Sequence, residues 1–585
     1  MENREMAPTV AGSKPARSLS LAIAGSGGAG VMTAGNMLLE AAARAGLYGL
    51  MVRISGPQIR GGEAGALLRF APQPVESLDD HFDVLIALDW QGVHRLAPEI
   101  PLGPHSLIIV DSAQGTPPEA YVRGAARCVE LAMKNLSKSV PGSWPNMIAL
   151  GIAAALLGLP AEAVDAVVKK SLKETSNGSV AASLAAVAAG RAAASDIGAS
   201  FTLARSAQSA PRWLITGNEA AGLGAIRGGV RFVAAYPITP ATEILEWMAP
   251  ALAQVGGLLV QAEDELASIN MVIGASYGGV PALTATAGPG LSLMTEALGL
   301  AVAAEVPVVV VDVMRGGPST GIPAKTEQSD IAIALNGLHG DAPRVVLAPN
   351  SIADCIVTTQ WAVHLAESLQ VPVIVLSDQF MGQSCAVIDA SPAVTFTGAR
   401  LSAAAGTENY RRYADHASGV SPMAIPGTAG LAYTADGLEH DEFGIPSSQA
   451  ADHHAQLAKR SRKLALADYG PLWADVEGDG DIAVITLGSS TGPVREAVAA
   501  ARSRGVPARM ISIRLLAPAR PAEFASALDG ARRVLVVEQN GGAQLYRYLR
   551  SQYDMPGDVR SLARPGPLAI RPSEVCRALT QWGNA

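Results

Sequence analysis

The feature that most constrains this chain is the repeated alternation of short apolar strands with alanine-rich helices. In the first example, an apolar strand at residues 19–24 is joined by a glycine-rich turn, 25–30, to a predicted helix at 31–45. Such alternation predicts parallel sheets covered by helices, because parallel strands need crossover connections. We therefore expect an α/β protein built from doubly wound domains.

The alternation recurs in three blocks, which we assign to three domains. The predicted boundaries are a first domain at 18–190, a linker at 191–212, a second domain at 213–395, an irregular connecting segment at 396–470 and a third domain at 471–585. The linker mixes alanine, serine and arginine without a sustained period. The connecting segment is long and polar, and such a stretch without regular structure is usually functional or interfacial.

Composition excludes several classes of protein. Hydrophobic residues make up 49% of the chain and charged residues 16%, with 60 glycines, which is typical of a compact α/β protein. The net charge of -8 argues against nucleic acid as a partner, because phosphate binding needs a basic face. Residues 1–17 lack the apolar core of a signal peptide, and the longest apolar stretch, 147–160, is too short to span a bilayer. We therefore expect neither export nor a membrane partner.

The cysteines bear on metal binding and on compartment. The chain has four, Cys128, Cys355, Cys385 and Cys576, and no two lie at the spacing of metal ligands. A pair separated by two residues would indicate zinc or an iron–sulfur cluster. We therefore expect no metal site in this chain. Scattered cysteines also fit the reducing conditions of the cytoplasm.

The glycine-rich turn has the setting of a phosphate site, since glycine N–H groups and a helix N-terminus both attract anions. The residues that we assign to this site are Gly25, Ser26, Gly27, Gly28 and Gly30. A dinucleotide would also need an acidic residue at the end of the second strand, where this chain has Ser55. NAD is therefore disfavoured, and a ligand such as coenzyme A stays open. The alternative is a tight turn with no ligand.

Two further motifs follow strands. Arg60 stands before two glycines, where it is either an anion or partner contact or a solvated loop arginine. The second motif is Tyr-Pro-Ile-Thr-Pro, whose first four residues are Tyr236, Pro237, Ile238 and Thr239. Its prolines fix the backbone and Thr239 offers a hydroxyl, although a rigid strand–helix junction would have the same prolines.

Charged residues also lie at two strand ends of the middle block. Glu263, Asp264 and Glu265 precede a helix, where acidic residues are common because of the helix dipole alone. They also follow a buried strand, at the edge where ligand crevices form. Arg315 follows another strand, beside two glycines, where it can bind a carboxylate with two parallel hydrogen bonds. A surface ion pair is the alternative for Arg315.

Together these motifs resemble the 2-oxoacid:ferredoxin oxidoreductases in the form in which a γ domain precedes the α domain. The resemblance is strongest to the α subunits that act on 2-oxoglutarate, and it covers nearly the whole chain. The glycine turn and Arg60 with its glycines match the γ part. The α part is matched by residues 236–240, 287–294, 315–321 with 325–330, and 437–444.

The resemblance implies a γ domain, a thiamine pyrimidine-binding domain and a transketolase C-terminal-like domain. It places the diphosphate-binding domain, its Mg²⁺ and a 4Fe–4S cluster on a separate β subunit, in an (αβ)2 heterotetramer. The only Gly-Asp-Gly triplet here, 478–480, precedes its strand and lacks the nearby asparagine of a diphosphate site, so we interpret it as a turn. The implied reaction converts a 2-oxo acid, coenzyme A and oxidised ferredoxin into acyl-CoA, carbon dioxide and reduced ferredoxin.

The resemblance also implies catalytic roles. Glu265, with Glu263 as second choice, hydrogen-bonds N1′ of thiamine and favours the imino form of its aminopyrimidine. Thr239 lies near the reacting carbonyl, and Arg315 binds the substrate carboxylate. The alternatives are the same complex acting on pyruvate, a branched-chain 2-oxo acid or indolepyruvate, and a non-catalytic scaffold that binds coenzyme A or a nucleotide.

Overall fold

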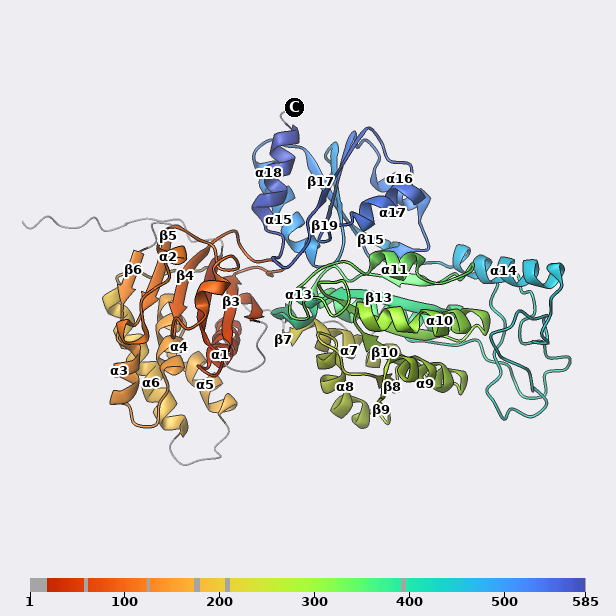
Figure 1. Cartoon of the computed structure of the whole chain (residues 1–585), viewed down its shortest axis with the longest axis horizontal. Helices are drawn as coiled ribbons and strands as arrows, with labels where there is room; N and C mark the ends of the chain where they lie inside the picture. The colour runs from red at the N-terminus through yellow and green to blue at the C-terminus, as the bar shows by residue number, and fades with distance from the viewer. Residues whose placement is uncertain are drawn as a thin grey trace, which may run out of the picture. The chain divides into compact units, whose positions relative to one another are not determined.

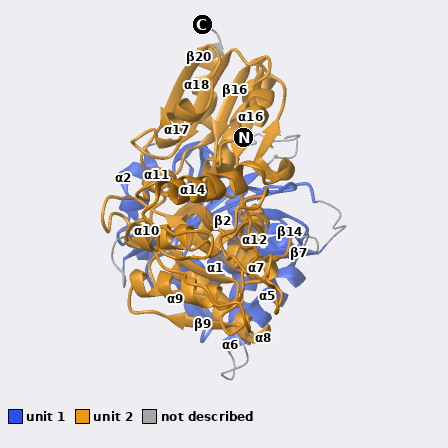
Figure 2. Ribbon diagram, turned by 90° about the vertical axis from the view of Figure 1, so that its right-hand side faces the viewer, with its two compact units in different colours: residues 1–214, 386–390 blue, residues 215–385, 391–585 orange. Residues whose placement is uncertain are grey.

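The computed structural model describes residues 18–56, 62–123, 127–172, 179–205, 211–390 and 396–583. Contacts divide the chain into two compact units (Figure 2). Unit 1 contains Met1–Leu214 with Ala386–Ala390, and unit 2 contains Ile215–Cys385 with Ser391–Ala585. The described residues form three sheets flanked by helices, which confirms the expected α/β class (Figure 1).

The eight-stranded sheet of unit 1 has the order β6-β5-β4-β1-β3-β2-β14-β7. Its strands are β1 (Leu19–Ser26), β2 (Tyr48–Ser55), β3 (Glu63–Ala71), β4 (Phe82–Ala87), β5 (Leu102–Val110), β6 (Arg127–Glu130), β7 (Arg212–Thr216) and β14 (Cys385–Asp389). We expected a parallel sheet, and this expectation was wrong for β3, which is antiparallel to both β1 and β2. The connection from β2 to β3 is too short for a crossover, so the chain must return in the opposite direction.

Two helices of unit 1 touch backbone to backbone. The helices of this unit are α1 (Val31–Arg44), α2 (Glu119–Val122), α3 (Met133–Ser139), α4 (Pro145–Leu156), α5 (Ala161–Ser171) and α6 (Ser179–Ala193). A Cβ on Gly151 of α4 would lie 2.1 Å from the carbonyl oxygen of Val187, and one on Gly190 of α6 would lie 2.1 Å from that of Ile148. Glycine is therefore required where α4 and α6 cross.

The helical run Ser179–Ile197, which contains α6, is the one described helix long and apolar enough to cross a membrane. Gly190 in this run packs directly against α4, and 33% of the run's apolar window is buried. This run also extends into the segment 191–212, which we expected to be a linker without regular structure. The helix continues there because alanine favours helix even where no apolar stripe is visible.

The seven-stranded sheet of unit 2 has the order β18-β12-β13-β11-β10-β8-β9. Its strands are β8 (Phe232–Ala235), β9 (Leu258–Gln261), β10 (Ala282–Thr286), β11 (Val308–Met314), β12 (Val345–Leu347), β13 (Pro372–Asp378) and β18 (Leu515–Ala517). Every adjacent pair is parallel except β12 with β18. Strands β10, β11 and β13 are buried along their whole length, as is typical of a parallel sheet with two covered faces.

Helices follow these strands in the order that the sequence predicted (Figure 1). They are α7 (Gly217–Gly228), α8 (Thr242–Gln254), α9 (Glu265–Tyr277), α10 (Gly288–Ala303), α11 (Ile331–Asn336), α12 (Ile352–Leu369) and α13 (Gln379–Gln383). Helix α7 begins with a capping box, in which Thr216 and Glu219 each accept a hydrogen bond from the other's backbone N–H. Such caps fix where the helices begin relative to the strand ends.

The remaining sheet of unit 2, with the order β15-β17-β16-β19-β20, forms what we call the third block, residues 474–583. Its strands are β15 (Ala474–Glu477), β16 (Ile482–Thr486), β17 (Ala508–Ile513), β19 (Arg533–Glu538) and β20 (Asp558–Ala563), and its helices are α15 (Thr491–Ser503), α16 (Pro521–Ala527), α17 (Gln544–Gln552) and α18 (Pro572–Gly583). Only the edge strand β15 is antiparallel to its neighbour. The triplet 478–480 connects β15 to β16, as expected of a turn.

The segment 396–470 is irregular as far as residue 449 and then forms a helix that we did not expect, α14 (Ala450–Ala465). Its buried residues are mostly polar: Gln456, Lys459, Arg460, Lys463 and Leu464. An amphipathic helix is recognised by an apolar stripe, and α14 instead turns charged side chains inward. An apolar stripe therefore does not show which face of α14 is buried.

The charged residues on the buried face of α14 belong to a buried charge cluster. Glu305, just after α10, is fully buried and forms ion pairs with Lys459 and, at 2.9 Å, with Lys463. The Arg412 guanidinium donates to the backbone carbonyl of Glu305 at 2.9 Å. Burial alone would raise the pKa of Glu305, yet Lys463 and Lys459 hold that pKa below its usual range. Burial also lowers the pKa of Lys459 to about 8, against the opposing effect of Glu305.

Candidate functional site

The predicted catalytic residues follow parallel strands of the seven-stranded sheet. Thr239 follows β8, Glu265 follows β9 and Arg315 follows β11. Strands β8, β9, β10 and β11 are neighbours and run parallel, so their carboxyl ends meet at one edge. In open α/β sheets this edge is where ligands bind.

The Tyr-Pro-Ile-Thr-Pro turn presents two side chains to solvent. Tyr236 and Thr239 are exposed, whereas Pro237 and Ile238 are half-buried. The backbone of this turn is held by helix α7, because the buried Asn218 of α7 donates a hydrogen bond to the carbonyl of Pro240 at 2.9 Å. The Thr239 hydroxyl is therefore accessible on a rigid support.

The three acidic residues before α9 occupy three different environments. Glu263 is exposed, and Asp264 caps the helix by accepting a hydrogen bond from the N–H of Ala267 at 2.7 Å. Glu265 is only 7% exposed. The helix-dipole interpretation accounts for Asp264, but it does not account for a buried carboxyl on the next residue.

Helix α10 makes room for the Glu265 side chain. A Cβ on Gly290 would lie 2.7 Å from Oε1 of Glu265 and 2.0 Å from Oγ1 of Thr286. Only glycine allows this first helical turn to pass over the carboxyl. Among the described residues Glu265 has no hydrogen-bond partner, and a buried carboxyl of this kind needs one. It is therefore available to a ligand.

Arg315 is 6% exposed and so is not part of a surface ion pair. Its Nη1 donates a hydrogen bond to the backbone carbonyl of Thr239, which joins two of the predicted residues, while its buried Nε has no partner among the described residues. Burial lowers the pKa of Arg315, and Asp330 and Asp312 oppose that effect. The guanidinium thus keeps unused donors at the edge of the sheet.

Asp312 and Asp330 are buried carboxyls beside Arg315. Asp312 lies within β11, and neither of its oxygens has a partner among the described residues. Burial first, and Asp330 second, raise the pKa of Asp312 well above its usual value. Burial also raises the pKa of Asp330 to about 7, with Glu327 adding to the rise and Arg315 opposing it. The Asp330 carboxyl therefore titrates near neutral pH, and the shift of Asp312 is in the same direction.

Sequence reasoning missed three residues of this edge: Asn218, Thr286 and Asp312. A signal existed for Asn218, which directly follows a strand and a glycine at the start of a helix. Thr286 ends a strand next to the Gly-Pro-Gly sequence that we noted. Asp312 carried no signal, because it interrupts an apolar strand and such a residue is equally compatible with a structural hydrogen bond.

The glycine turn of unit 1 has already used part of its hydrogen-bonding capacity. The backbone N–H and hydroxyl of Ser26 both donate to the carboxylate of Asp89, at 3.0 and 2.8 Å. The N–H of Gly27 donates to the carbonyl of Gly62 at 2.5 Å. Arg60, which we assigned to the same site, lies outside the described residues.

The turn still offers donors in front of α1. Gly28 and Gly30 have φ values of +96° and +83°, and a Cβ on Gly28 would meet nothing within 4 Å. Helix α1 has neither a side-chain cap nor an acidic residue in its first turn, so no side chain occupies its N-terminal N–H groups. A phosphate would therefore approach Gly28 and the start of α1, with Asp89 as an unfavourable neighbouring charge.

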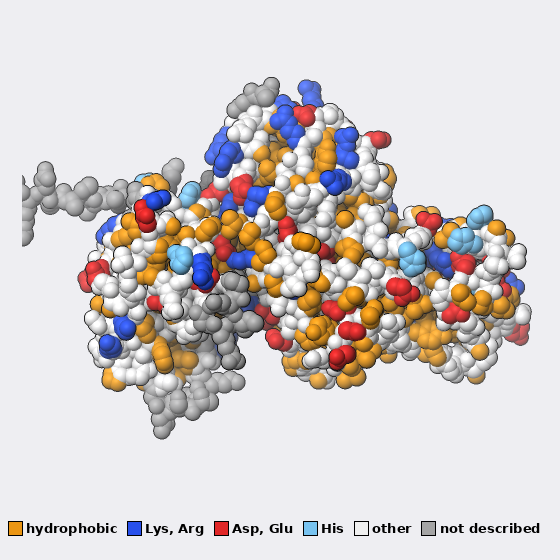
Figure 3. All heavy atoms as spheres, viewed as in Figure 1, with side chains coloured by type: hydrophobic (Ala, Val, Ile, Leu, Met, Phe, Trp, Pro, Cys, Tyr) orange, Lys and Arg blue, Asp and Glu red, His pale blue; other side chains and the backbone are white. Residues whose placement is uncertain are grey.

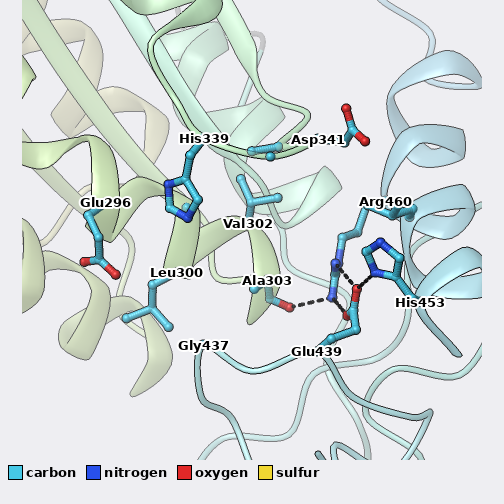
Figure 4. Close-up of a pocket in the computed structure, with 14 residues that line it drawn as sticks. Glu296, Leu300, Val302, Ala303, His339, Asp341, Gly437, Glu439, His453 and Arg460 are labelled. Carbon is cyan, nitrogen blue, oxygen red and sulfur yellow. Dashed lines mark hydrogen bonds and ion pairs between the residues drawn. The ribbon is translucent and has the colours of Figure 1, made fainter. Parts of the chain in front are cut away.

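A separate pocket of about 210 Å³ lies at the other end of α10 and contains none of the predicted catalytic or cofactor-binding residues (Figure 4). Glu439 accepts from Arg460 at 2.8 Å and pairs with His453 at 2.6 Å, and Arg460 also donates to the carbonyl of Ala303. The part of the chain that the structure describes contains no group of three or more His, Cys, Asp or Glu side chains able to hold a metal ion.

Three descriptions of known families match successive parts of the chain. "Pyruvate ferredoxin/flavodoxin oxidoreductase" matches residues 20–193. "Pyruvate flavodoxin/ferredoxin oxidoreductase, thiamine diP-bdg" matches residues 223–460, the region that contains Thr239, Glu265 and Arg315. "Pyruvate:ferredoxin oxidoreductase core domain II" matches residues 480–575.

Individual proteins are similar over most of the chain. The 2-oxoacid:ferredoxin oxidoreductase subunit alpha of Sulfolobus sp is 30% identical over 90% of this chain and 91% of its own length. The 2-oxoglutarate synthase subunit KorA of Methanothermobacter marburgensis is 39% identical over 62% of this chain and 97% of its own length. A solved 2-oxoglutarate:ferredoxin oxidoreductase from Magnetococcus marinus, with 2-oxoglutarate, coenzyme A and succinyl-CoA bound, is 34% identical, covers 97% of this chain and 100% of the matched chain, and gives a TM-score of 0.90.

Proposed function

The chain belongs to the 2-oxoacid:ferredoxin oxidoreductase family, and on this premise we propose that it is the α subunit of a 2-oxoglutarate:ferredoxin oxidoreductase. The complex would convert 2-oxoglutarate, coenzyme A and oxidised ferredoxin into succinyl-CoA, carbon dioxide and reduced ferredoxin. The similarity to proteins named for 2-oxoglutarate supports this substrate over pyruvate, branched-chain 2-oxo acids and indolepyruvate.

The observation that carries the proposal is the buried carboxyl of Glu265 beneath Gly290. A buried carboxyl without a partner fits the ring nitrogen N1′ of thiamine, and the absence of a Cβ on Gly290 leaves its position free. When bound, thiamine diphosphate supplies the carbon nucleophile and the electron sink for decarboxylation. Glu265 would hold the proton at N1′ by a hydrogen bond to that ring nitrogen.

The neighbouring residues would orient the 2-oxo acid. Arg315 would bind the substrate carboxylate through the donors that its hydrogen bond to Thr239 leaves unused. The exposed Thr239 hydroxyl would lie near the reacting carbonyl. Tyr236, Pro237 and Ile238 would form the wall against the pyrimidine.

The site needs a second subunit. Large hydrophobic side chains lie exposed around it: Tyr236, Leu266, Met271, Leu293 and Ile322. Figure 3 shows hydrophobic side chains gathered over the end of unit 2 that carries α8 and α9. Exposed apolar surface beside an incomplete site is typical of a subunit interface. We infer a β subunit that carries the diphosphate site, Mg²⁺ and the 4Fe–4S cluster, in a cytoplasmic (αβ)2 heterotetramer that reduces ferredoxin.

Unit 1 would contribute to the coenzyme A site. Its glycine turn retains the free N–H groups of a phosphate site, and the chain has no acidic residue at the end of β2 for a dinucleotide ribose. Arg60 would add a positive charge from the neighbouring loop. The non-catalytic scaffold alternative predicts a ligand here but no turnover by the complex.

The test is to reconstitute the chain with its β subunit and to assay 2-oxo acids in parallel. We expect the highest kcat/KM with 2-oxoglutarate, and lower values with pyruvate, branched-chain 2-oxo acids and indolepyruvate. A higher value with another acid would reassign the substrate within the family. No turnover with any of them would support the scaffold alternative.

Arg315 provides a sharper test of the substrate site. We expect Arg315→Ala to raise the KM for 2-oxoglutarate about 10- to 100-fold, the effect of losing a charged hydrogen bond, with the KM for coenzyme A nearly unchanged. Arg315→Lys should also be impaired, because lysine cannot form two parallel hydrogen bonds. Equal effects on both substrates would mean that Arg315 only supports the Thr239 turn.

A further inference from the structure

The loop that follows Arg315 is held by the third block. Residues 315–330 connect β11 to α11, and Gln328 near its end is fully buried. The backbone N–H of Gln328 donates to the carbonyl of Gln539 at 2.7 Å. Asn540 donates from its side chain to the carbonyl of Gln328 at 3.1 Å. The loop backbone is therefore paired across the boundary between two sheets.

The side chain of Gln328 also forms hydrogen bonds with the third block. Its Oε1 accepts from the N–H of Gln539 at 2.9 Å and from the hydroxyl of Ser490 at 3.2 Å, and its Nε2 donates to the carbonyl of Leu487 at 3.0 Å. These partners follow β16 and β19, so one amide contacts two strand ends of the third block. A buried and fully paired amide fixes orientation as well as distance, which apolar packing alone does not.

A second path of hydrogen bonds reaches Arg315 itself. Gln544, the first residue of α17, donates to the carbonyl of Ser329 at 2.8 Å and accepts from the N–H of Ala332 at 2.8 Å. The Ser329 hydroxyl donates to the backbone carbonyl of Arg315 at 3.2 Å. Two successive hydrogen bonds through Ser329 therefore link the third block to the backbone of Arg315.

The next residue bears on the charge of Arg315. Asp330 lies against the start of α10, since a Cβ on Gly288 would be 2.4 Å from its Oδ1. Its negative charge is the strongest ionic influence on the Arg315 guanidinium. Because Gln328 is held in place, the adjacent residues Ser329 and Asp330 are held as well. Ser329 hydrogen-bonds to the backbone of Arg315, and Asp330 acts on its guanidinium through charge.

We propose that the third block clamps the loop 315–330, and that Gln328 and Gln544 are positioning residues which keep Arg315 where it binds the carboxylate of a 2-oxo acid. This inference rests on the proposed function. Displacement of a binding group by about 1 Å is enough to cost up to 100-fold in rate, so a rigid polar clamp is a reasonable requirement of such a site. The third block would then take part in substrate binding without touching the substrate.

The experiment compares the two ends of α17 in the reconstituted complex. Gln544→Ala removes both bonds to the loop, and Gln552→Ala makes the same change at an exposed residue of the same helix, whose side-chain amide donates to the hydroxyl of its neighbour Ser551. We expect Gln544→Ala to raise the KM for 2-oxoglutarate about three- to tenfold, as for one lost hydrogen bond, with little change in the KM for coenzyme A. Gln552→Ala should change neither.

Gln328→Glu is the stronger variant, because it removes the donor to Leu487 and introduces a charge into a buried amide site. It should raise the KM for 2-oxoglutarate further, and thermal unfolding of the complex would show separately whether stability falls. If stability or the amount of assembled complex falls in either variant while the KM for 2-oxoglutarate is unchanged, the clamp is only structural and the inference is wrong. If the wild-type complex turns over no 2-oxo acid, the proposed function itself fails.

Discussion

At the scale of single residues, Glu263 and Glu265 offer a matched comparison. Both are glutamates next to the start of α9, but Glu263 is exposed whereas Glu265 is buried beneath Gly290. We expect Glu265→Ala to slow exchange of the thiamine C2 proton in the assembled complex by about 10²- to 10⁴-fold, because the acid–base partner of the aminopyrimidine is lost. The measurement is C2 proton exchange followed by NMR after rapid quenching.

Glu263→Ala is the control for that experiment, since it removes the same group two residues away. It should leave the exchange rate within about twofold of wild type, as is typical of an exposed position away from the chemistry. The opposite ranking of the two variants would move the role to Glu263.

The same pair shows what could be predicted from sequence at this scale. The acidic residues were expected to follow a buried strand, but β9 is an edge strand whose residues are exposed or half-buried. Their place at the carboxyl end of a strand is as expected, and family resemblance ranks Glu265 first. Their environments could not be predicted, because the burial of Glu265 depends on Gly290, which is distant in sequence. The raised pKa values of Asp312 and Asp330 likewise arise from burial among partners contributed by separate elements.

At the scale of elements, the charge cluster around Glu305 holds α14 in place. We expect Glu305→Gln to destabilise this region by about 3–5 kcal/mol, because the cations Lys459 and Lys463 would lose their buried anion. Hydrogen exchange at the amides of α14 should then be faster. Glu296→Gln, at an exposed position within α10, is the control and should leave that exchange unchanged. Unaltered exchange in Glu305→Gln would show that other contacts hold α14.

This cluster also shows which elements sequence reasoning finds. The short apolar runs 232–235 and 282–286 predict buried parallel strands, and β8 and β10 have these boundaries. Helix α14 was missed because its buried face is charged, and the antiparallel β3 was missed because helix–strand alternation suggested crossovers throughout. For α14 the decisive information is a partner from another part of the chain, whereas for β3 it is the short connection from β2.

The glycine turn before α1 permits a second test at the scale of elements. Gly28 has φ of +96° and open space around its Cβ position, so Gly28→Val places a side chain where an anion would approach. We expect it to raise the KM for coenzyme A about tenfold or more, equivalent to at least 1.4 kcal/mol, while carbon dioxide release without coenzyme A is unaffected. The two half-reactions are followed separately in the reconstituted complex.

A substitution at a second glycine of unit 1 serves as the control for backbone strain. Gly158, after α4, has φ of +61° and also has nothing within 4 Å of its Cβ position. Gly158→Val therefore introduces comparable strain, about 1–2 kcal/mol, away from the turn. If both variants weaken coenzyme A binding equally, the effect is strain and the turn is only structural.

At the scale of the whole molecule, we expect the purified chain without its β subunit to be colourless and inactive. Of its cysteines, Cys355, Cys385 and Cys576 are buried and Cys128 is exposed, and the described residues contain no cluster of metal ligands. Its Gly-Asp-Gly triplet connects β15 to β16, before a strand and not after one. Iron analysis, the absorbance near 400 nm (about the region of iron–sulfur charge transfer) and turnover of 2-oxoglutarate are measured on the chain alone and after addition of the β subunit. Iron and turnover should appear only in the complex, because Glu265 and Arg315, in the roles proposed for them, would bind one half of the cofactor and the substrate but would not transfer electrons. Stoichiometric iron in the chain alone, or turnover by it, would contradict the division of the site between two subunits.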